Sequence, residues 1–286
     1  MRILVTGGVG FIGGHLVDTL VKLKHNVLVI DNNPFSYNEK QGVDYYYRDI
    51  SDINNISDLF YNIDYVFHLA AESRIQPAIL NPSLAYRTNV LGTLNVLEAS
   101  KKYKIKKVIY SSTSSVYGLT QTFPTHERCH IDCLNPYAHS KFLGEELFRQ
   151  YSYEVSSIIL RYFNVFGENS PINGPYVPVV GIFKEQARQG LPLTIVGDGS
   201  RRRDFVYVGD VVSANIAAMK SSIGRANIFN IGSGRNITIK EIADLISSNQ
   251  IHIADRDGEA DNTLACIDSA KEFLEWEPSV FIEDWV

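Results

Sequence analysis

A row of five hydroxyl side chains, Ser-Ser-Thr-Ser-Ser at residues 111–115, directly follows a short apolar run. Further along, the segment NPYAHSK places Tyr137 and Lys141 four residues apart, which is about one helical turn. A tyrosine phenol, with a pKa near ~10, is a weak base at neutral pH, but a neighbouring ammonium group favours the phenolate. A hydroxyl of the row would hold a substrate oxygen in line with Tyr137. These residue types therefore predict proton transfer to and from a hydroxyl, although serine and threonine also favour loops.

The Tyr-x-x-x-Lys spacing occurs twice, since Tyr103 and Lys107 repeat it. Tyr103 lies in a lysine-rich approach to the strand expected at 107–111, where its partner would face away from any cofactor. Tyr137 instead follows Pro136, which is typical of the start of a helix. We therefore expect Tyr137 and Lys141 to be the functional pair.

A glycine-rich segment, TGGVGFIGG at residues 6–14, follows the first apolar run. Gly7, Gly10 and Gly13 are spaced to form a tight turn that brings backbone close to a pyrophosphate, at the start of a helix whose free N–H groups face the anion. Asp31 ends the next strand, 18 residues after Gly13. An acid at that place binds the adenosine ribose and repels a 2′-phosphate. The pattern predicts a dinucleotide site that prefers NAD to NADP.

The elements that position these residues alternate along the chain. Short apolar runs at 3–5, 27–30, 66–69, 108–110 and 157–160 are separated by amphipathic segments that include 11–23, 88–102 and 138–152. Such alternation predicts an α/β fold, a Rossmann-type doubly wound parallel sheet. Residues 1–164 are expected to form the NAD-binding domain, to which 205–231 adds later sheet elements. Residues 165–286, with a helical stretch at 178–189, are expected to form a smaller substrate-binding domain.

Composition narrows the function further. The 286-residue chain carries a net charge of −5, which argues against a nucleic-acid surface. No apolar run approaches the ~18 residues of a membrane span, and no secretory signal is evident at the start. Three cysteines do not make a disulfide framework, so a cytoplasmic setting is expected. The cluster His126, Cys129, His130 and Cys133 lacks the usual spacing of zinc ligands, and no metal site is expected.

Five motifs in order along nearly the whole chain resemble those of the extended short-chain dehydrogenase/reductases, specifically NAD-dependent nucleotide-sugar epimerases. The motifs are TGGVGFIG, HLAA, SSTSSVYG, YAHSK and LRYFNVFG. The resemblance assigns the catalytic hydroxyl to Thr113. Related dehydratases carry Asp and Glu directly after it, and related decarboxylases a glutamate before the Val-Tyr-Gly. Ser114 and Ser115 stand there instead and lack this acid–base capacity, which disfavours both reactions.

The resemblance also implies binding residues. Those expected to contact the cofactor, beyond the glycine loop, Asp31, Tyr137 and Lys141, are Phe11, Ile12, Asn32, Asp49, Ile50, Leu69, Ala70, Ala71, Asn89, Ser111 and Phe163. Those expected to contact the sugar nucleotide are Thr113, Asn164, Arg203, Arg256 and Thr263. The chain departs from the family where Ala265-Cys266 replaces the frequent Ala-Asp, which weakens the alignment around Thr263.

The expected reaction is 4-epimerisation of a UDP-hexose through a transient 4-keto intermediate, with NAD retained through turnover. A UDP-glucuronate 4-epimerase and a nucleotide-sugar reductase remain as alternatives on the same scaffold, and a non-catalytic NAD-binding protein is the less favoured third. The amphipathic segments 88–102 and 138–152 resemble helices that pair across family dimers, so a homodimer is also expected.

Overall fold

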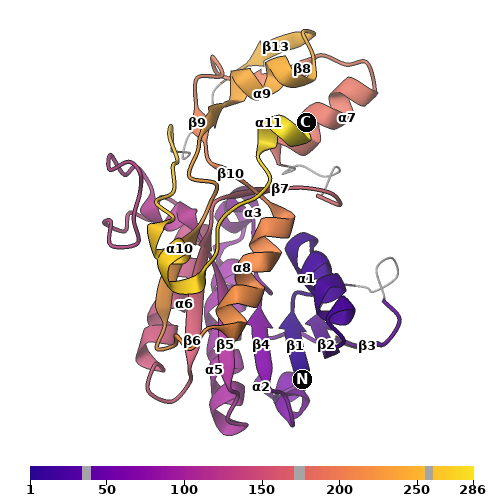
Figure 1. The fold of residues 1–286 in the computed structure, drawn as a ribbon, viewed down its shortest axis with the longest axis vertical. Coiled ribbons are helices and arrows are strands. Elements are labelled where there is room, and N and C mark those ends of the chain that lie inside the picture. The colour runs from indigo at the N-terminus through magenta and orange to yellow at the C-terminus, as the bar shows by residue number, and fades with distance from the viewer. Residues whose placement is uncertain (34–39, 171–177, 255–259) are drawn as a thin grey trace.

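The computed structural model describes residues 1–33, 40–170, 178–254 and 260–286. Its centre is a seven-stranded sheet in the order β11-β6-β5-β4-β1-β2-β3, with every neighbouring pair parallel (Figure 1). The strands are β1 (Arg2–Thr6), β2 (Asn26–Asp31), β3 (Val43–Tyr47), β4 (Tyr65–His68), β5 (Lys107–Thr113), β6 (Ser157–Tyr162) and β11 (Asn227–Ile231). The order 3-2-1-4-5-6 defines a doubly wound sheet, so the predicted fold class is confirmed.

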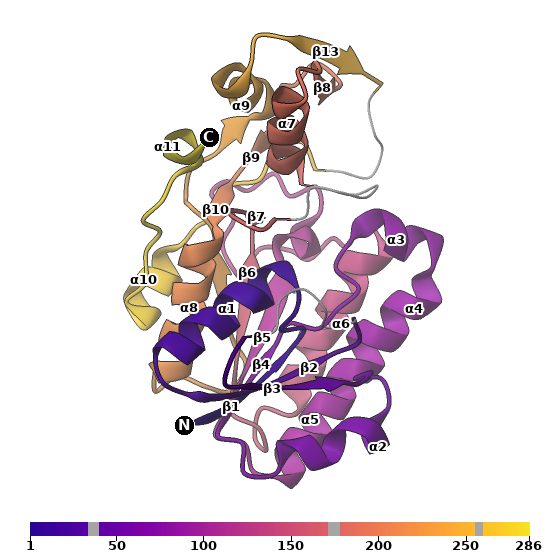
Figure 2. The ribbon, with the colours of Figure 1, turned by 90° about the vertical axis from the view of Figure 1, so that its right-hand side faces the viewer.

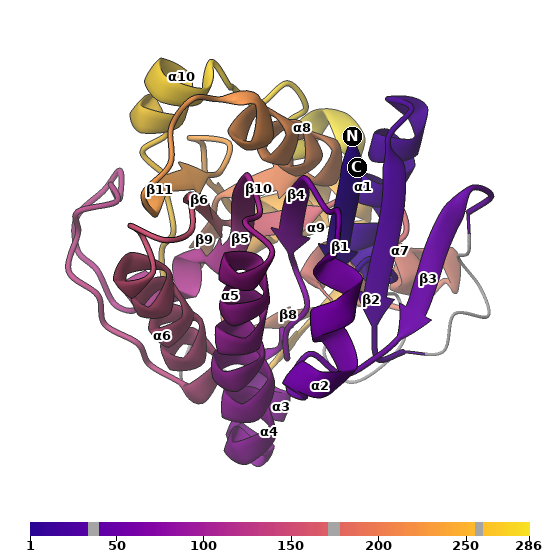
Figure 3. The ribbon, with the colours of Figure 1, turned by 90° about the horizontal axis from the view of Figure 1, so that it is seen from below.

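Helices cover both faces of this sheet (Figure 3). One layer holds α1 (Phe11–Lys22), α8 (Val208–Lys220) and α10 (Asp268–Leu274). The other holds α2 (Ile53–Ile56), η1 (Ser57–Phe60), α5 (Gly92–Lys102) and α6 (Pro136–Gln150), with α3 (Ile75–Leu80), α4 (Pro82–Tyr86) and the π-helix η2 (Arg87–Leu91) beside them. Because both faces are covered, β1, β2, β4, β5 and β6 are buried almost along their whole length.

The smaller half of the molecule lies beyond the carboxyl ends of the strands (Figure 2). It contains α7 (Val179–Arg188), α9 (Ile239–Ile246) and α11 (Ile282–Trp285), and three two-stranded sheets. These pair β7 (Asn164–Phe166) with β10 (Phe205–Tyr207), β8 (Leu193–Val196) with β13 (Gln250–Ile253), and β9 (Arg202–Arg203) with β12 (Ile237–Thr238). Residues 205–231 were expected to add elements to the central sheet. Of the two strands in that range, β11 joins the central sheet, whereas β10 pairs with β7 instead. Within the described ranges, no helix is long and apolar enough to cross a membrane.

Candidate active site

The glycine loop joins β1 to α1 at the carboxyl edge of the sheet. Gly7 has φ +74°, and a Cβ there would lie 2.6 Å from the Ala70 nitrogen. A Cβ on Gly13 would lie 2.1 Å from the Gly7 carbonyl oxygen. No side chain caps the start of α1, so its first N–H groups are available to an anion. The loop therefore fits the pyrophosphate of a dinucleotide, which Gly7, Gly10, Gly13 and the amides of Phe11 and Ile12 would hold.

Asp31 sits beside this loop at the end of β2. Its carboxylate accepts hydrogen bonds from the Val9 nitrogen at 3.0 Å and the Asn33 nitrogen at 3.0 Å, which leaves lone pairs for a ribose hydroxyl. A hollow next to it is lined by Asn32, Tyr47, Arg48, Asp49 and Asn55. Two residues expected to contact the cofactor, Asn32 and Asp49, thus lie together. Ile50 is buried under Gly92, and its carbonyl oxygen accepts a hydrogen bond from Asn95.

The loop after β4 forms the opposite wall. The Ala70 nitrogen donates to the Thr6 hydroxyl at 3.2 Å, which holds Leu69, Ala70 and Ala71 against the glycine loop. The Asn89 side chain is buried and bonds both backbone groups of Glu72 and the Ser140 hydroxyl. It braces this loop against α6, so its direct cofactor contact stays a prediction.

Thr113 is the last residue of β5 and caps the short 3-10 helix η3 (Ser114–Tyr117). Its hydroxyl accepts from the Ser115 nitrogen at 3.1 Å and lies 3.1 Å from the Ser115 hydroxyl. Ser111, two residues earlier, bonds the Tyr162 hydroxyl in the interior. Ser112, between them and on the opposite face of the strand, donates to the buried Glu145 carboxylate.

Tyr137 lies in the first turn of α6, which begins there because Asn135 accepts from the Ala138 nitrogen and Pro136 occupies the first helical position. Burial raises the pKa of the Tyr137 phenol, while a hydrogen bond with Thr113 and the charge of Arg74 oppose that shift. Burial lowers the pKa of Lys141, one turn later, to about 7. The Lys141 ammonium lies 4.2 Å from the centre of the Tyr110 ring. The predicted phenol and hydroxyl thus interact at one edge of the sheet, and the predicted ammonium lies one helical turn along α6, over the Tyr110 ring.

Phe163 and Asn164 carry the chain from β6 into the smaller half. Phe163 is buried and its ring centre lies 6.4 Å from that of Tyr117. The Asn164 amide donates to the Asp204 carbonyl at 2.9 Å and to the Thr263 hydroxyl at 3.3 Å.

Asp204 ties this region together, because its buried carboxylate accepts hydrogen bonds from Ser233, Gly234 and Ala265. Arg203, on β9, donates to two backbone carbonyls, one of them that of Asp261. Asn164, Arg203 and Thr263 therefore belong to one neighbourhood. Arg256 lies outside the described residues.

Two charged groups at this edge were not predicted from the sequence. The half-buried Arg74 guanidinium lies close enough to Tyr137 for each to influence the pKa of the other. It makes no side-chain hydrogen bond or ion pair within residues 1–33, 40–170, 178–254 and 260–286. Glu145 is fully buried one turn beyond Lys141. Glu145 follows Tyr137 by eight residues in the sequence. This spacing, which places both residues on one helical face, could have indicated that Glu145 lies near the site.

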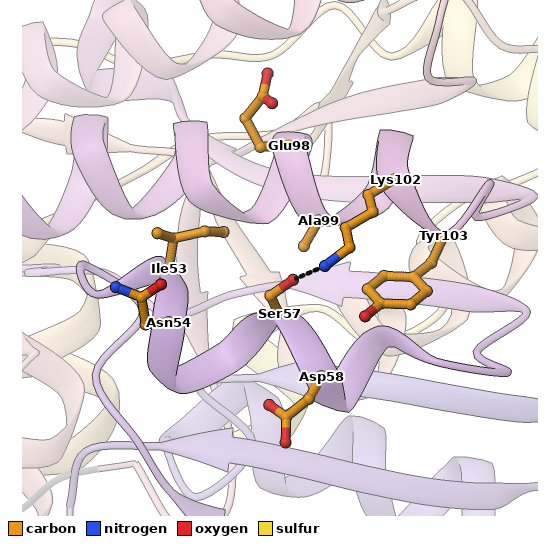
Figure 4. A pocket seen from close by; sticks show the side chains of 8 residues that line it. All are labelled: Ile53, Asn54, Ser57, Asp58, Glu98, Ala99, Lys102 and Tyr103. Carbon is orange, nitrogen blue, oxygen red and sulfur yellow. Dashed lines mark hydrogen bonds between the residues drawn. The ribbon is translucent and has the colours of Figure 1, made fainter.

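A second hollow has no part in this site. It lies between the α2–η1 segment and α5, where Lys102 donates to Ser57 (Figure 4). Tyr103 lines it, and Lys107 is buried at the opposite end of β5 from Thr113, where it bonds the Ala218 carbonyl. The alternative pair is therefore separated from the glycine loop. No three His, Cys, Asp or Glu side chains converge as metal ligands in the part of the chain that the structure describes.

A dinucleotide loop beside a phenol, a hydroxyl and an ammonium group defines an enzyme that moves a proton and a hydride on a bound substrate. The chain belongs to the NAD-dependent epimerase/dehydratase family, whose sequence model matches residues 3–232.

Several known proteins resemble the chain over nearly its whole length. A putative UDP-glucose 4-epimerase from Methanocaldococcus jannaschii is 35% identical over 99% of this chain and 95% of its own. The structure of UDP-glucose 4-epimerase with UDP-glucose from Thermotoga maritima is 36% identical with a TM-score of 0.95, covering 99% and 96%. That of a Bacillus cereus UDP-glucuronic acid 4-epimerase with NAD and a fluorinated UDP-glucuronic acid is 30% identical with a TM-score of 0.89, covering 99% and 96%. The protein is an NAD-dependent isomerase of the nucleotide-sugar epimerase type.

Proposed function

We propose that the protein interconverts UDP-glucose and UDP-galactose by inverting carbon 4, and that it also accepts the N-acetylated pair. The observation that carries this proposal is the placement of Tyr137, in the first turn of α6, and Thr113, at the end of β5, close enough to influence the Tyr137 pKa and beside a loop shaped for a dinucleotide. Serine at 114 and 115 supports epimerisation over dehydration or decarboxylation, because neither side chain can serve as an acid or base near neutral pH.

Each residue has a role in this reaction. NAD, when bound, supplies the hydride acceptor and donor for carbon 4. Tyr137 takes the proton of the 4-hydroxyl and later returns it, while Thr113 holds the same oxygen in line. Lys141 stabilises the phenolate by its charge. Asn164 and Arg203 hold the diphosphate, for which the planar guanidinium is well suited, so that the sugar can turn over between the two proton transfers.

The test is a screen of UDP-glucose, UDP-galactose and their N-acetylated forms for epimeric product by NMR, without added cofactor. Product from these sugars is expected, with no net consumption of NAD(P)H. A steady-state demand for added NAD(P)H would identify a reductase, and no turnover of any UDP-, GDP- or dTDP-sugar would favour a non-catalytic binding protein.

One observation favours a second candidate, a UDP-glucuronate 4-epimerase. The Arg74 guanidinium beside Tyr137 has no anionic partner among the described residues, and a carboxylate at carbon 6 of the sugar would provide one. If so, Arg74→Gln should lower kcat/KM for UDP-glucuronate at least ~10-fold, as loss of a charged hydrogen bond does, and leave UDP-glucose little changed. Arg149→Gln, at the exposed end of α6, is the matched control. Equal effects on both sugars would remove this candidate.

Thr263 is proposed as a wall of the sugar pocket. A small residue there leaves space for a 2-acetamido group, and the hydrogen bond from Asn164, itself proposed to bind the substrate, supports the assignment. Thr263→Tyr should therefore slow UDP-N-acetylglucosamine far more than UDP-glucose, because overfilling a packed site costs ~1–3 kcal/mol. Kinetics with both sugars check this, and a parent enzyme inactive on the acetamido sugar would remove the assignment.

We also propose that the protein is a homodimer joined through the helices around α5 and α6. Supporting this, Leu80, Leu84 and Leu91 expose 76%, 43% and 43% of their surface on the adjoining α3–η2 segment. Light scattering should give twice the 32.1 kDa chain mass. Leu84→Asp should weaken the dimer, whereas Leu191→Asp, at a similarly exposed leucine in the smaller half, should not. A concentration-independent monomer in the parent protein would contradict the proposal.

A further inference from the structure

Glu145 and Arg161 form an ion pair in the interior beneath the catalytic residues. Both side chains are at most 1% exposed. The pair is bidentate, with Arg161 Nη2 2.5 Å from Glu145 Oε2 and Nε 2.9 Å from Oε1. Such pairs are costly to bury, and well-packed apolar residues often replace them without loss of stability. The presence of this pair therefore calls for a reason other than stability.

The pair joins the elements that carry the catalytic groups. Glu145 follows Lys141 by one turn of α6, and its Oε1 also accepts a hydrogen bond of 2.5 Å from Ser112, the residue before Thr113. Arg161, on β6, donates through Nη1 to the Tyr117 hydroxyl at 2.8 Å and to the Glu127 carbonyl at 3.2 Å. A single carboxylate of α6 therefore binds Ser112 at the end of β5 and Arg161 on β6.

The same carboxylate acts on the charge of Lys141. Burial lowers the pKa of the Lys141 ammonium, and Glu145 is the group that opposes this shift. Burial also acts to lower the pKa of Arg161, but its bonds to Glu145 hold that pKa above the usual value.

Few other ionisable groups face Lys141 from the elements packed around α6. Burial lowers the pKa of His68 to about 3, so it is neutral, and the Tyr110 pKa is raised well above its usual value, so it is also neutral. The ionisable groups that interact with Lys141 or with its near neighbours are Tyr137 and Glu145 on α6, Tyr110 on β5, His68 on β4, Arg161 on β6, Tyr117 on η3, Arg74 before α3, and Glu127, Asp132 and Cys133 in the segment before α6. Among these, Glu145 is the negative charge nearest to Lys141 along α6.

We propose that Glu145 is a positioning residue, which supplies the negative charge one turn from Lys141 and fixes the strand end that carries Thr113, and that Arg161 is buried to hold the Glu145 side chain in place. The inference rests on the proposed role of Lys141 beside the Tyr137 base. The ammonium supports the phenolate only while it is protonated, so its contribution is lost as pH rises through the Lys141 pKa. Removing the negative charge lowers that pKa, so activity should fall at a lower pH.

The experiment is the pH profile of turnover for Glu145→Gln and Glu145→Asp with whichever UDP-sugar the parent enzyme converts. Gln keeps the shape and removes the charge, whereas Asp keeps the charge and disturbs the packing. For Glu145→Gln, the ratio of variant to parent turnover is expected to fall between pH 6 and pH 9, about tenfold for each unit of Lys141 pKa lost. Glu145→Asp should follow the parent profile even if its thermal stability is lower.

A loss of turnover in Glu145→Gln that is the same at every pH would overturn the proposal. So would a larger loss of turnover in Glu145→Asp than in Glu145→Gln, with neither pH profile displaced. Either result would mean that the ion pair has only a structural role. If Glu145→Gln does not fold, the double variant Glu145→Gln/Arg161→Gln avoids an unpaired buried charge and must show the same displacement. A parent enzyme without turnover would count against the proposed function, which is a separate outcome.

Discussion

Tyr137→Phe is expected to lower turnover at least ~100-fold, the usual loss on removing a general base, while NAD stays bound. Phenylalanine keeps the ring in the first turn of α6 but removes the phenol hydroxyl that interacts with Thr113. NMR of the product measures turnover, and release of NAD from denatured protein measures retention of the cofactor.

Tyr103→Phe is the matched control, because Tyr103 has the same spacing to a lysine but lines the hollow between α2 and α5. It should leave turnover unchanged. Near-normal activity of Tyr137→Phe, or a damaging effect of Tyr103→Phe, would show that the base is assigned to the wrong residue.

Gly13→Ala is expected to weaken NAD binding by about 10- to 100-fold. The added Cβ would lie 2.1 Å from the Gly7 carbonyl oxygen, and that oxygen also accepts the hydrogen bond from Gly10 that closes the turn. The turn must shift, and overpacking of this kind costs ~1–3 kcal/mol. Calorimetry with NAD measures the affinity, and circular dichroism checks that the variant is folded.

Gly14→Ala provides the control one residue later. A Cβ there has 3.9 Å to its nearest neighbour, the Gly8 carbonyl oxygen, and alanine is the better helix former. NAD affinity should be unchanged and the protein slightly more stable. Equal losses in the two variants would mean that the loop does not bind the cofactor through close backbone approach.

The central sheet could be predicted because its strands are buried on both faces and therefore appear as continuous apolar runs. β3, at the edge of the sheet, could not be predicted in this way. Its sequence VDYYY is not a continuous apolar run, and its residues are exposed or only partly buried. The strands of the smaller half were mostly missed as well. β9 and β12 have two residues each, too few to show any period, and they form only because distant segments meet.

The reacting groups of the site were predictable because their chemistry needs fixed residue types at fixed spacings. Arg74 could not be found in this way, because a lone arginine in a loop has no pattern and its relation to Tyr137 depends on how α3 packs on α6. For Ser111 and Asn89, the contact with the cofactor stays a prediction. The structure adds that both side chains form hydrogen bonds inside the protein, which the sequence could not reveal because these bonds depend on packing.

The sequence segment 88–102 was expected to be one regular helix, yet η2 closes a π-type turn at Arg87–Leu91 before α5 begins. A π-type turn holds one residue more than an α-helical turn, and one residue rotates an α-helix by about 100°. The turn is in effect a one-residue insertion, and Asn89 within it reaches both Glu72 and Ser140. Shortening this segment by one residue would rotate α4 about its axis relative to α5. That rotation would turn the exposed leucines of the α3–η2 segment and would also displace Asn89, which holds the loop after β4. The number of residues in this segment therefore determines whether Asn89 can hold the loop after β4 against α6.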